Sequence, residues 1–266
     1  MLIAILVFII LSVIYISFIM PRLIDRADMS YLKVDYAHRG LHNEELPENS
    51  IGAFKNAVEH RYGIELDIQL SKDKVPMVFH DATLTRVCGI DAKLADYTCE
   101  ELCRMKLLGS EYTIPTLKEV LETVDGKVPL LVEFKTGTLE LCDIACPILD
   151  EYHGIFCVES FDPRILKKIK KMRPRYARGQ LVTNSIKDKS CPGFAQNFLL
   201  TSLFSHLLSR PDFVACDQKM KYNPSVFLCK YLFRVPMFVW TVKSEDDYTK
   251  HHKKKNMTIF EGFIPE

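Results

Sequence analysis

Residues 63–81 of the chain read GIELDIQLSKDKVPMVFHD. Apolar and polar side chains alternate in the first eight of these residues, which is typical of a β-strand with one buried face. The polar face of this strand carries Glu65, Asp67 and Gln69. Taken alone, the pattern also fits an amphipathic strand whose polar face is simply solvated.

The next apolar run, residues 75–80, begins only a few residues later. This separation is too short for a crossover to a parallel strand, so the two runs are predicted to form a hairpin. A two-residue loop at Asp73 and Lys74 would set Asp67 opposite His80, with both side chains on one face of the hairpin. The hairpin therefore predicts acidic side chains beside an imidazole, an arrangement that a solvated surface does not require.

Short apolar runs alternate with amphipathic helical stretches through the rest of the chain. The other predicted strands are residues 34–37, 128–134, 155–160, 179–182, 213–215, 237–242 and 258–264. Helices are predicted for residues 50–61, capped by Ser50 or Asn49, for 116–124, and for 163–172, which opens on a proline. This alternation predicts one α/β domain with a mainly parallel sheet. Its length of about 230 residues suits a TIM-type (β/α)8 barrel.

A third acidic residue ends another apolar run. Glu133 closes residues 128–133, and Lys135 lies on the same face of that strand. A salt bridge at the strand end would explain the pair, but polar residues at the carboxyl ends of barrel strands are the usual active-site positions. Glu65, Asp67 and Glu133 together would suit a hard divalent cation such as Ca²⁺ or Mg²⁺, which prefers oxygen ligands.

Two histidines and two cations complete this pattern. His38 and His80 can act as acid and base because imidazole titrates near neutrality. Arg39 and Lys135 supply the positive charges that a phosphate group requires. A metal, two histidines and two cations together predict cleavage of a phosphodiester.

An ordered series of motifs resembles the glycerophosphodiester phosphodiesterase family over residues 34 to about 264. The motifs are His38-Arg39-Gly40, Pro47-Glu48-Asn49-Ser50 with Ala53-Phe54, Glu65-Leu66-Asp67, His80-Asp81 with Thr83-Leu84 and Arg86, Ile114-Pro115-Thr116-Leu117, Glu133-Phe134-Lys135, Ser160-Phe161-Asp162-Pro163 and Trp240-Thr241-Val242. The resemblance implies a TIM-type barrel, a divalent metal held at Glu65, Asp67 and Glu133, and catalytic histidines at His38 and His80. It also implies that Arg39 and Lys135 contact the phosphate.

The resemblance leaves the roles of two residues undecided, and the sequence departs from the family pattern at two places. Trp240 is either an ordinary core residue or a side chain that stacks on the substrate at the barrel mouth. Asn49 is either a helix cap or a brace near the site. Lys243 replaces an asparagine common in the family, and the usual ending Asp-Gly-Ile-Ile-Thr-Asp-x-Pro is shortened here to residues 261–266. We expect the last strand to be present and the helix that often follows it to be absent. These departures concern the substrate and barrel closure rather than the metal and the histidines.

The first twenty residues, MLIAILVFIILSVIYISFIM, contain no charged side chain. A helix of this length measures about 30 Å, the thickness of the hydrocarbon core of a bilayer. The stretch lacks the basic n-region and small-residue cleavage site of a signal peptide, and also the polar face of a buried core helix. We therefore expect a transmembrane anchor at residues 1–20, a linker at 21–33 and the barrel at 34–266, as in a membrane-anchored, bacterial-type member of the family.

Basic residues set the expected orientation in the cell membrane. Arg22, Arg26 and Lys33 follow the anchor, whereas only the terminal amine precedes it. Basic residues that flank a transmembrane helix tend to stay on the cytoplasmic side of the membrane. We therefore expect the catalytic domain of this single-pass protein in the cytoplasm. The nine cysteines form no C-x-x-C pair, and we expect mostly reduced, buried thiols rather than metal ligands or disulfides.

The favoured function is metal-dependent hydrolysis of a small-molecule or lipid-derived glycerophosphodiester to an alcohol and glycerol 3-phosphate. A phospholipase C-like or lysophospholipase D-like enzyme acting on membrane lipid, and a non-catalytic anchored barrel that binds lipid or a partner, are the alternatives. A net charge of +1 gives no electrostatic reason to expect nucleic acid as a partner. The sequence leaves the head group, the native metal and the oligomeric state open.

Overall fold

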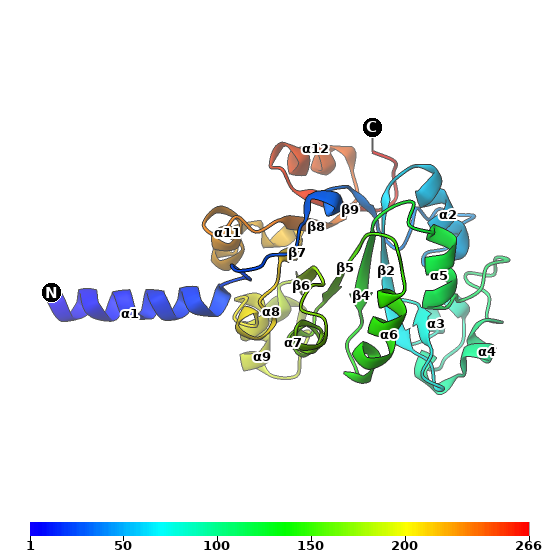
Figure 1. Ribbon diagram of the computed structural model, residues 1–266, viewed down its shortest axis with the longest axis horizontal. Helices are drawn as coiled ribbons and strands as arrows, with labels where there is room; N and C mark the ends of the chain where they lie inside the picture. The colour runs from blue at the N-terminus through cyan, green and yellow to red at the C-terminus, as the bar shows by residue number, and fades with distance from the viewer. Residues whose placement is uncertain (266) are drawn as a thin grey trace.

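The structure is a computed structural model that describes residues 1–265, apart from the side chain of residue 221. Figure 1 shows a rounded α/β body from which one long helix projects. The expected end of the barrel at residue 266 lies outside the described residues.

Eight parallel strands close into a barrel in the order β1-β2-β4-β5-β6-β7-β8-β9, and β9 pairs with β1. A ninth strand, β3, pairs antiparallel with β2. The strands are β1 Tyr36–Ala37, β2 Gly63–Leu70, β3 Pro76–Val78, β4 Leu130–Phe134, β5 Phe156–Ser160, β6 Arg178–Val182, β7 Phe213–Asp217, β8 Met237–Val242 and β9 Met257–Phe260. This topology confirms the predicted TIM-type barrel.

Helices surround the barrel and fill the connections between its strands (Figure 1). They are α1 Leu2–Ile19, α2 Ile51–Glu59, α3 Thr85–Cys88, α4 Cys99–Leu102, α5 Leu117–Val124, α6 Glu140–Asp150, α7 Pro163–Met172, α8 Ser185–Asp188, α9 Phe194–Thr201, α10 His206–Ser209, α11 Pro224–Tyr231 and α12 Glu245–Lys253, with 3-10 turns at Ser30–Leu32, Leu94–Asp96 and Gln218–Tyr222. Ser50, one of the two predicted caps of α2, accepts a hydrogen bond from the amide of Ala53. Thr116, which was not predicted as a cap, forms a capping box with Glu119 at the start of α5.

Alternate side chains of the strands build two layers of core. One face of each strand packs against the helices, and the other fills the barrel with residues such as Tyr36, Leu131, Phe213 and Phe238. Gly179 leaves room for the Phe213 ring, because a Cβ at residue 179 would lie 2.0 Å from that ring. The interior of the barrel is therefore a packed core rather than a channel.

The predicted register of the hairpin is wrong by one residue. Asp67 was expected opposite His80, but Ile68 pairs with Val78, and the amide of Phe79 donates to the carbonyl of Asp67. The cause is the loop: Ser71 bonds to Val75 across three residues instead of two, and Lys74 takes up the added residue with a left-handed φ of +66°.

The last strand is also shorter than predicted. β9 ends at Phe260, not at residue 264. The amide of Glu261 still donates to Val242, but Gly262 then adopts a φ of +81° and turns the chain out of the sheet. Glu261 therefore lies at the carboxyl end of β9, at the same end of the barrel as the residue that follows β1.

Candidate active site

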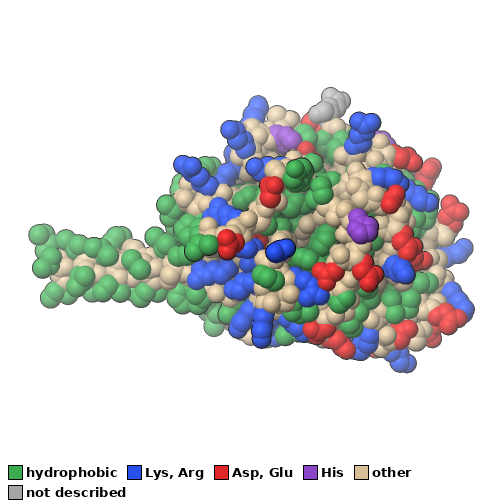
Figure 2. All heavy atoms as spheres, viewed as in Figure 1, with side chains coloured by type: hydrophobic (Ala, Val, Ile, Leu, Met, Phe, Trp, Pro, Cys, Tyr) green, Lys and Arg blue, Asp and Glu red, His purple; other side chains and the backbone are tan. Residues whose placement is uncertain are grey.

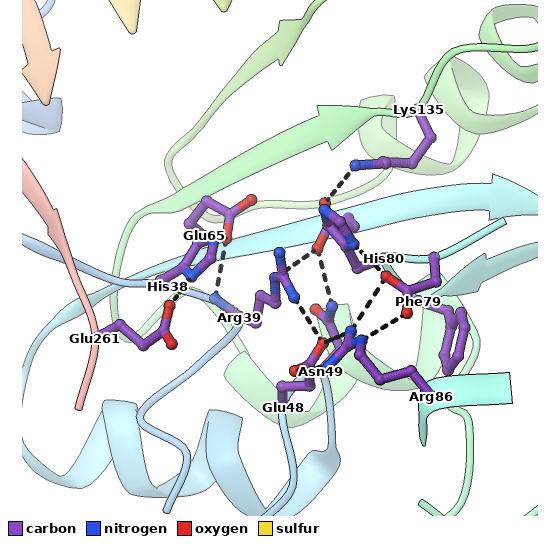
Figure 3. Close-up of polar contacts among 12 residues, drawn as sticks. His38, Arg39, Glu48, Asn49, Glu65, Phe79, His80, Arg86, Lys135 and Glu261 are labelled. Atoms are coloured by element: carbon purple, nitrogen blue, oxygen red, sulfur yellow. Dashed lines mark hydrogen bonds and ion pairs between the residues drawn. The ribbon is translucent and has the colours of Figure 1, made fainter. Parts of the chain in front are cut away.

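The segment after β1 turns sharply at the carboxyl end of the barrel. Arg39 and Gly40 both have left-handed φ values, +56° and +81°, and a Cβ at residue 40 would lie 2.9 Å from the Phe54 ring. This turn aims the amide of Arg39 at Glu65, whose Oε2 accepts its hydrogen bond at 2.9 Å (Figure 3). The backbone of the His-Arg-Gly motif is thus fastened to β2.

His38 lies between two carboxylates. Its Nδ1 is 2.7 Å from Oε2 of Glu261, and its Nε2 is 4.0 Å from Oε2 of Glu65. Burial lowers the pKa of His38, and the contact with Glu261 opposes that shift. Glu261 also pairs with Lys243, whose Nζ lies 3.1 Å from Oε1. The Nδ1 contact fixes the ring and leaves Nε2 on the side of the barrel carboxylates.

Three carboxylates, two from β2 and one from β4, converge inside the barrel. Glu65, Asp67 and Glu133 are all buried, and each offers an oxygen within 4.8 Å of the others. Asp67 and Glu133 are register partners on adjacent strands, so their side chains emerge side by side into the barrel. Burial raises the pKa of Glu65, and that of Glu133 to about 7, and the neighbouring acids add to both shifts.

Two cations face this cluster. Nζ of Lys135 is 3.2 Å from Oδ1 of Asp67 and 3.0 Å from Oε1 of Glu133, and Nε of Arg39 is 3.6 Å from Oδ2 of Asp67. Burial opposes ionisation of Asp67, but Lys135, His80 and Arg39 together hold its pKa below the usual range. Lys135 keeps its proton because the two acids outweigh the effect of its own burial on its pKa.

The donor set fits a hard divalent cation. A fourth buried acid, Glu159, stands beside Glu133 on β5, and its Oε2 has no hydrogen-bond partner among the described residues. Four buried carboxyl groups therefore face two half-buried cations, so the acidic groups outnumber the positive charges that could neutralise them. Oxygen donors in such a setting are the ligands that Ca²⁺ and Mg²⁺ prefer.

His80 reaches the site in spite of the shifted register. β3 ends at Val78, so the strand alternation no longer governs the side chain of His80. His80 lies near enough to Asp67 that the two charges shift each other's pKa, although burial is the larger effect and lowers the pKa of His80. Its Nδ1 is held 2.6 Å from Oδ1 of Asp81.

One arginine braces the loops on this side of the site. Arg86 contacts Asp81 through Nε at 2.7 Å and Glu48 through Nη1 at 2.7 Å (Figure 3). Glu48 also accepts from Arg39 at 2.8 Å. The network links the loop after β1 to the segment that carries His80.

The comparison with protein families decides the assignment. The model of the Glycerophosphoryl diester phosphodiesterase family matches residues 38–261, which include every candidate site residue. The chain belongs to this family.

Named relatives of this phosphodiesterase family agree over part of the chain. A glycerophosphodiester phosphodiesterase of Caldanaerobacter subterraneus is 34% identical over 158 residues, which are 54% of this chain and 65% of the relative. One of Bacillus altitudinis is 39% identical over 107 residues, which are 38% of this chain and 43% of the relative. The matched segments thus span less than two thirds of either relative.

Solved structures extend the likeness to almost the whole fold. The glycerophosphodiester phosphodiesterase of Thermotoga maritima superposes with a TM-score of 0.67 at 27% identity, covering 85% of this chain and 93% of that one. An Oleispira antarctica phosphodiesterase, solved in complex with the product sn-glycerol-3-phosphate, gives a TM-score of 0.71 at 23% identity, covering 86% and 92%. At that identity the second likeness shows the fold alone.

In this family member the structure decides between the two roles expected of Asn49, and it adds two acids that the sequence did not predict, Glu159 and Glu261. Asn49 is a brace and not the helix cap, because its Nδ2 donates to Oδ2 of Asp67 at 2.9 Å while Ser50 caps α2. Glu159 shares a strand face with buried Cys157, and this alternation was the available signal for an interior acid. For Glu261 no local signal existed, because its role depends on where β9 ends.

Trp240 contacts another aromatic ring at this end of the barrel. It lies near the carboxyl end of β8 and packs edge to face on Phe161, with ring centroids 5.7 Å apart. Its buried Nε1 has no hydrogen-bond partner among the described residues. The structure therefore brings His38, His80, Arg39, Lys135 and the three carboxylates together, and leaves the indole of Trp240 against Phe161.

Proposed function

We propose that the protein is a metal-dependent hydrolase that converts glycerophosphodiesters into an alcohol and glycerol 3-phosphate. The observation that carries the proposal is the convergence of His38, His80 and three buried carboxylates at one end of a barrel of this family. An activity of this class is what the printed names of the relatives describe. A non-catalytic barrel would not need this convergence.

The two histidines are proposed as the proton carriers. In the reaction, one P–O bond of the diester breaks, the released alcohol oxygen takes up a proton, and an attacking oxygen gives one up. His38 and His80 are oriented through Nδ1 by Glu261 and Asp81, which leaves Nε2 of each ring for these transfers. The family resemblance further implies that a neighbouring hydroxyl of the substrate attacks first and that water then opens the cyclic phosphate.

Arg39, Lys135 and Trp240 are proposed to bind the substrate. The two cations would hold phosphate oxygens, and the unpartnered Nε1 of Trp240 would donate to the substrate while the ring packs against its glycerol part. Glu65, Asp67 and Glu133 would hold Ca²⁺ or Mg²⁺. When bound there, the ion would supply positive charge beside the phosphate.

Residues 1–20 are proposed as a membrane anchor, 21–33 as a linker, and 34–266 as the catalytic domain on the cytoplasmic side. α1 is long and apolar enough to cross a membrane, and Ile19 is its one buried residue, whereas a soluble core helix would be mostly buried. A signal sequence near the N-terminus passes the same test of length and composition.

A lysophospholipase D-like activity is the second candidate, and it takes a substrate from the membrane itself. A lysophospholipase D of Rattus norvegicus is 31% identical over 140 residues, which are 48% of this chain and 44% of that relative. A catalytic barrel tethered beside a bilayer would have such lipids within reach.

Purified full-length protein, assayed with a panel of glycerophosphodiesters and lysophospholipids with and without added metal, tests both candidates. We expect metal-dependent release of glycerol 3-phosphate from at least one soluble diester. Turnover of lysophospholipids alone would favour the second candidate, and no turnover of any diester would contradict both.

A further inference from the structure

Exposed apolar side chains gather around the end of α1 where it meets the barrel. Six of those carried by α9, α10 and α11 are here called the apolar collar: Phe194, Phe198, Leu199, Leu207, Phe227 and Tyr231. Their exposed fractions reach 72% for Phe194 and 58% for Tyr231. Outside α1, the exposed phenylalanines of the described chain all belong to the collar. A concentration of this kind marks a contact surface on a soluble body.

The collar is continuous with α1. Phe194 stacks on Phe198, Phe198 meets Phe204 edge to face at 5.8 Å, and Phe204 contacts Phe18 at 5.1 Å. A continuous series of aromatic contacts therefore runs from Phe194, the most exposed large apolar residue of α9, to the last turn of α1. Figure 1 shows α8, α9 and α11 grouped around that end of the helix.

Polar contacts hold α1 against the same helices. The carbonyl of Ile19 lies 3.0 Å from Nδ1 of buried His206 in α10. The hydroxyl of Tyr15 lies 2.7 Å from Oγ of Ser225 in α11. Both contacts involve the last two turns of α1. They therefore fix the position of the collar along the axis of α1, beside its C-terminal end.

If α1 crosses a bilayer, this position brings the collar close to the membrane surface. α1 has 18 residues, so it measures about 27 Å, slightly less than a hydrocarbon core of about 30 Å. A helix this short must use its whole length to cross, including the turns at Tyr15 and Phe18 that the barrel contacts. Helices packed against those turns must then lie at the level of the lipid head groups.

We propose that the apolar collar is inserted into the interfacial layer of the membrane and seats the barrel on the bilayer. This inference rests on the proposed membrane anchoring by α1. Aromatic side chains favour this layer because their rings are apolar while the surroundings remain partly hydrated. Exposed Lys187 and Lys189 on and beside α8 add ammonium groups at its rim, and Figure 2 shows basic side chains on the flank from which α1 leaves.

Quenching of introduced tryptophans by lipids with brominated acyl chains tests the inference. The full-length protein is placed in lipid nanodiscs as Phe194→Trp, Phe227→Trp, the matched control Leu139→Trp and the anchor probe Val7→Trp. Leu139 is an exposed apolar residue that directly precedes α6, a helix that lies away from α1 (Figure 1). The signal of native Trp240 is subtracted with the unsubstituted protein, and retained phosphodiesterase activity or circular dichroism verifies folding.

We expect the collar tryptophans to lose most of their added fluorescence, and to be quenched more by bromine near the head group than by bromine near the chain end. The Leu139→Trp signal should stay unchanged. Quenching at Val7→Trp without quenching at the collar would overturn the inference while leaving the anchor in place. Absence of quenching at both would remove the anchor as well. A blue-shifted collar signal without quenching would mean that a second protein copy covers the surface, which also overturns it.

Discussion

His38 and His80 are held in the same way by different partners. Glu261 fixes Nδ1 of His38, and Asp81 fixes Nδ1 of His80, so each ring presents its other nitrogen. The sequence singled out Glu65 and Asp67 through strand alternation and Glu133 through its place at the end of an apolar run. It reached His80 through a hairpin register that is wrong by one residue. It did not identify Glu261, because the position of this residue beside His38 depends on the closure of the barrel, which brings the ends of β1 and β9 together.

His38→Ala and His80→Ala should each lower kcat about 10²–10⁴-fold, because each removes a proton carrier from the reaction. Steady-state rates with a soluble diester measure the loss, and circular dichroism should show an unchanged fold. His153→Ala is the matched control, since His153 is exposed and distant in sequence from the site motifs. A loss of equal size in the control would contradict the roles of the two histidines.

Glu65→Gln and Asp67→Asn should weaken metal binding, because each replaces a charged oxygen donor with a neutral one. Calorimetric titration of metal-free protein with Ca²⁺ or Mg²⁺ measures the affinity independently of activity. Glu119→Gln, a change in the capping box of α5, is a carboxylate control that should leave the affinity unaltered. Unchanged binding in the Glu65 and Asp67 variants would place the metal elsewhere.

Glu261→Gln should shift the pH profile of kcat/KM to lower pH on the limb that reports His38. The carboxylate of Glu261 raises the pKa of His38 against the larger, opposite effect of burial, so removing its charge lets the pKa fall further. Lys243→Gln should have the opposite effect. It removes the cation that pairs with Glu261, so the carboxylate raises the pKa of His38 more strongly, and the same limb should move to higher pH. Shifts in the same direction for both variants would refute this electrostatic account.

At the scale of elements, the hairpin shows what the sequence could and could not predict. Hydrophobic alternation located β2 with its observed bounds, and the short gap required an antiparallel return. The register depended on one loop residue, Lys74, whose left-handed conformation has no signature in its residue type. His80 still reaches the site because β3 ends two residues before it.

Lys74→Gly should raise the free energy of unfolding by about 0.5–1 kcal/mol, since glycine adopts a positive φ without the steric cost that other residues carry. For a protein of this size that corresponds to a rise in Tm of about 1–4 °C, measurable by thermal denaturation in detergent. Lys72→Gly, in the same loop but with no positive φ, should lower Tm. A lower Tm for Lys74→Gly would contradict the observed loop conformation.

At the scale of the molecule, the alternation of strands and helices was sufficient to predict the barrel, and composition was sufficient to single out α1. The sequence could not show how α1 meets the barrel. That contact joins Ile19 to His206, 187 residues apart, and no local pattern reports such a pairing.

The proposed topology predicts that protease added to intact cells leaves the catalytic domain uncut and digests it once the membrane is opened. The basic residues Arg22, Arg26 and Lys33 after α1 are the physical reason, because basic flanks tend to stay on the cytoplasmic side. Immunoblotting against the C-terminal part of the chain reads the result. Digestion in intact cells would place the barrel, and its substrates, outside.

The central claim is metal-dependent cleavage that leaves the phosphate on glycerol. Phosphorus NMR of glycerophosphocholine incubated with the full-length protein follows both the bond that breaks and its rate. We predict that the diester signal is replaced by that of glycerol 3-phosphate, that chelation stops the conversion, and that Ca²⁺ or Mg²⁺ restores it in the unsubstituted protein but not in His38→Ala. Conversion at an unchanged rate after chelation, or a phosphocholine signal in place of glycerol 3-phosphate, would contradict the account.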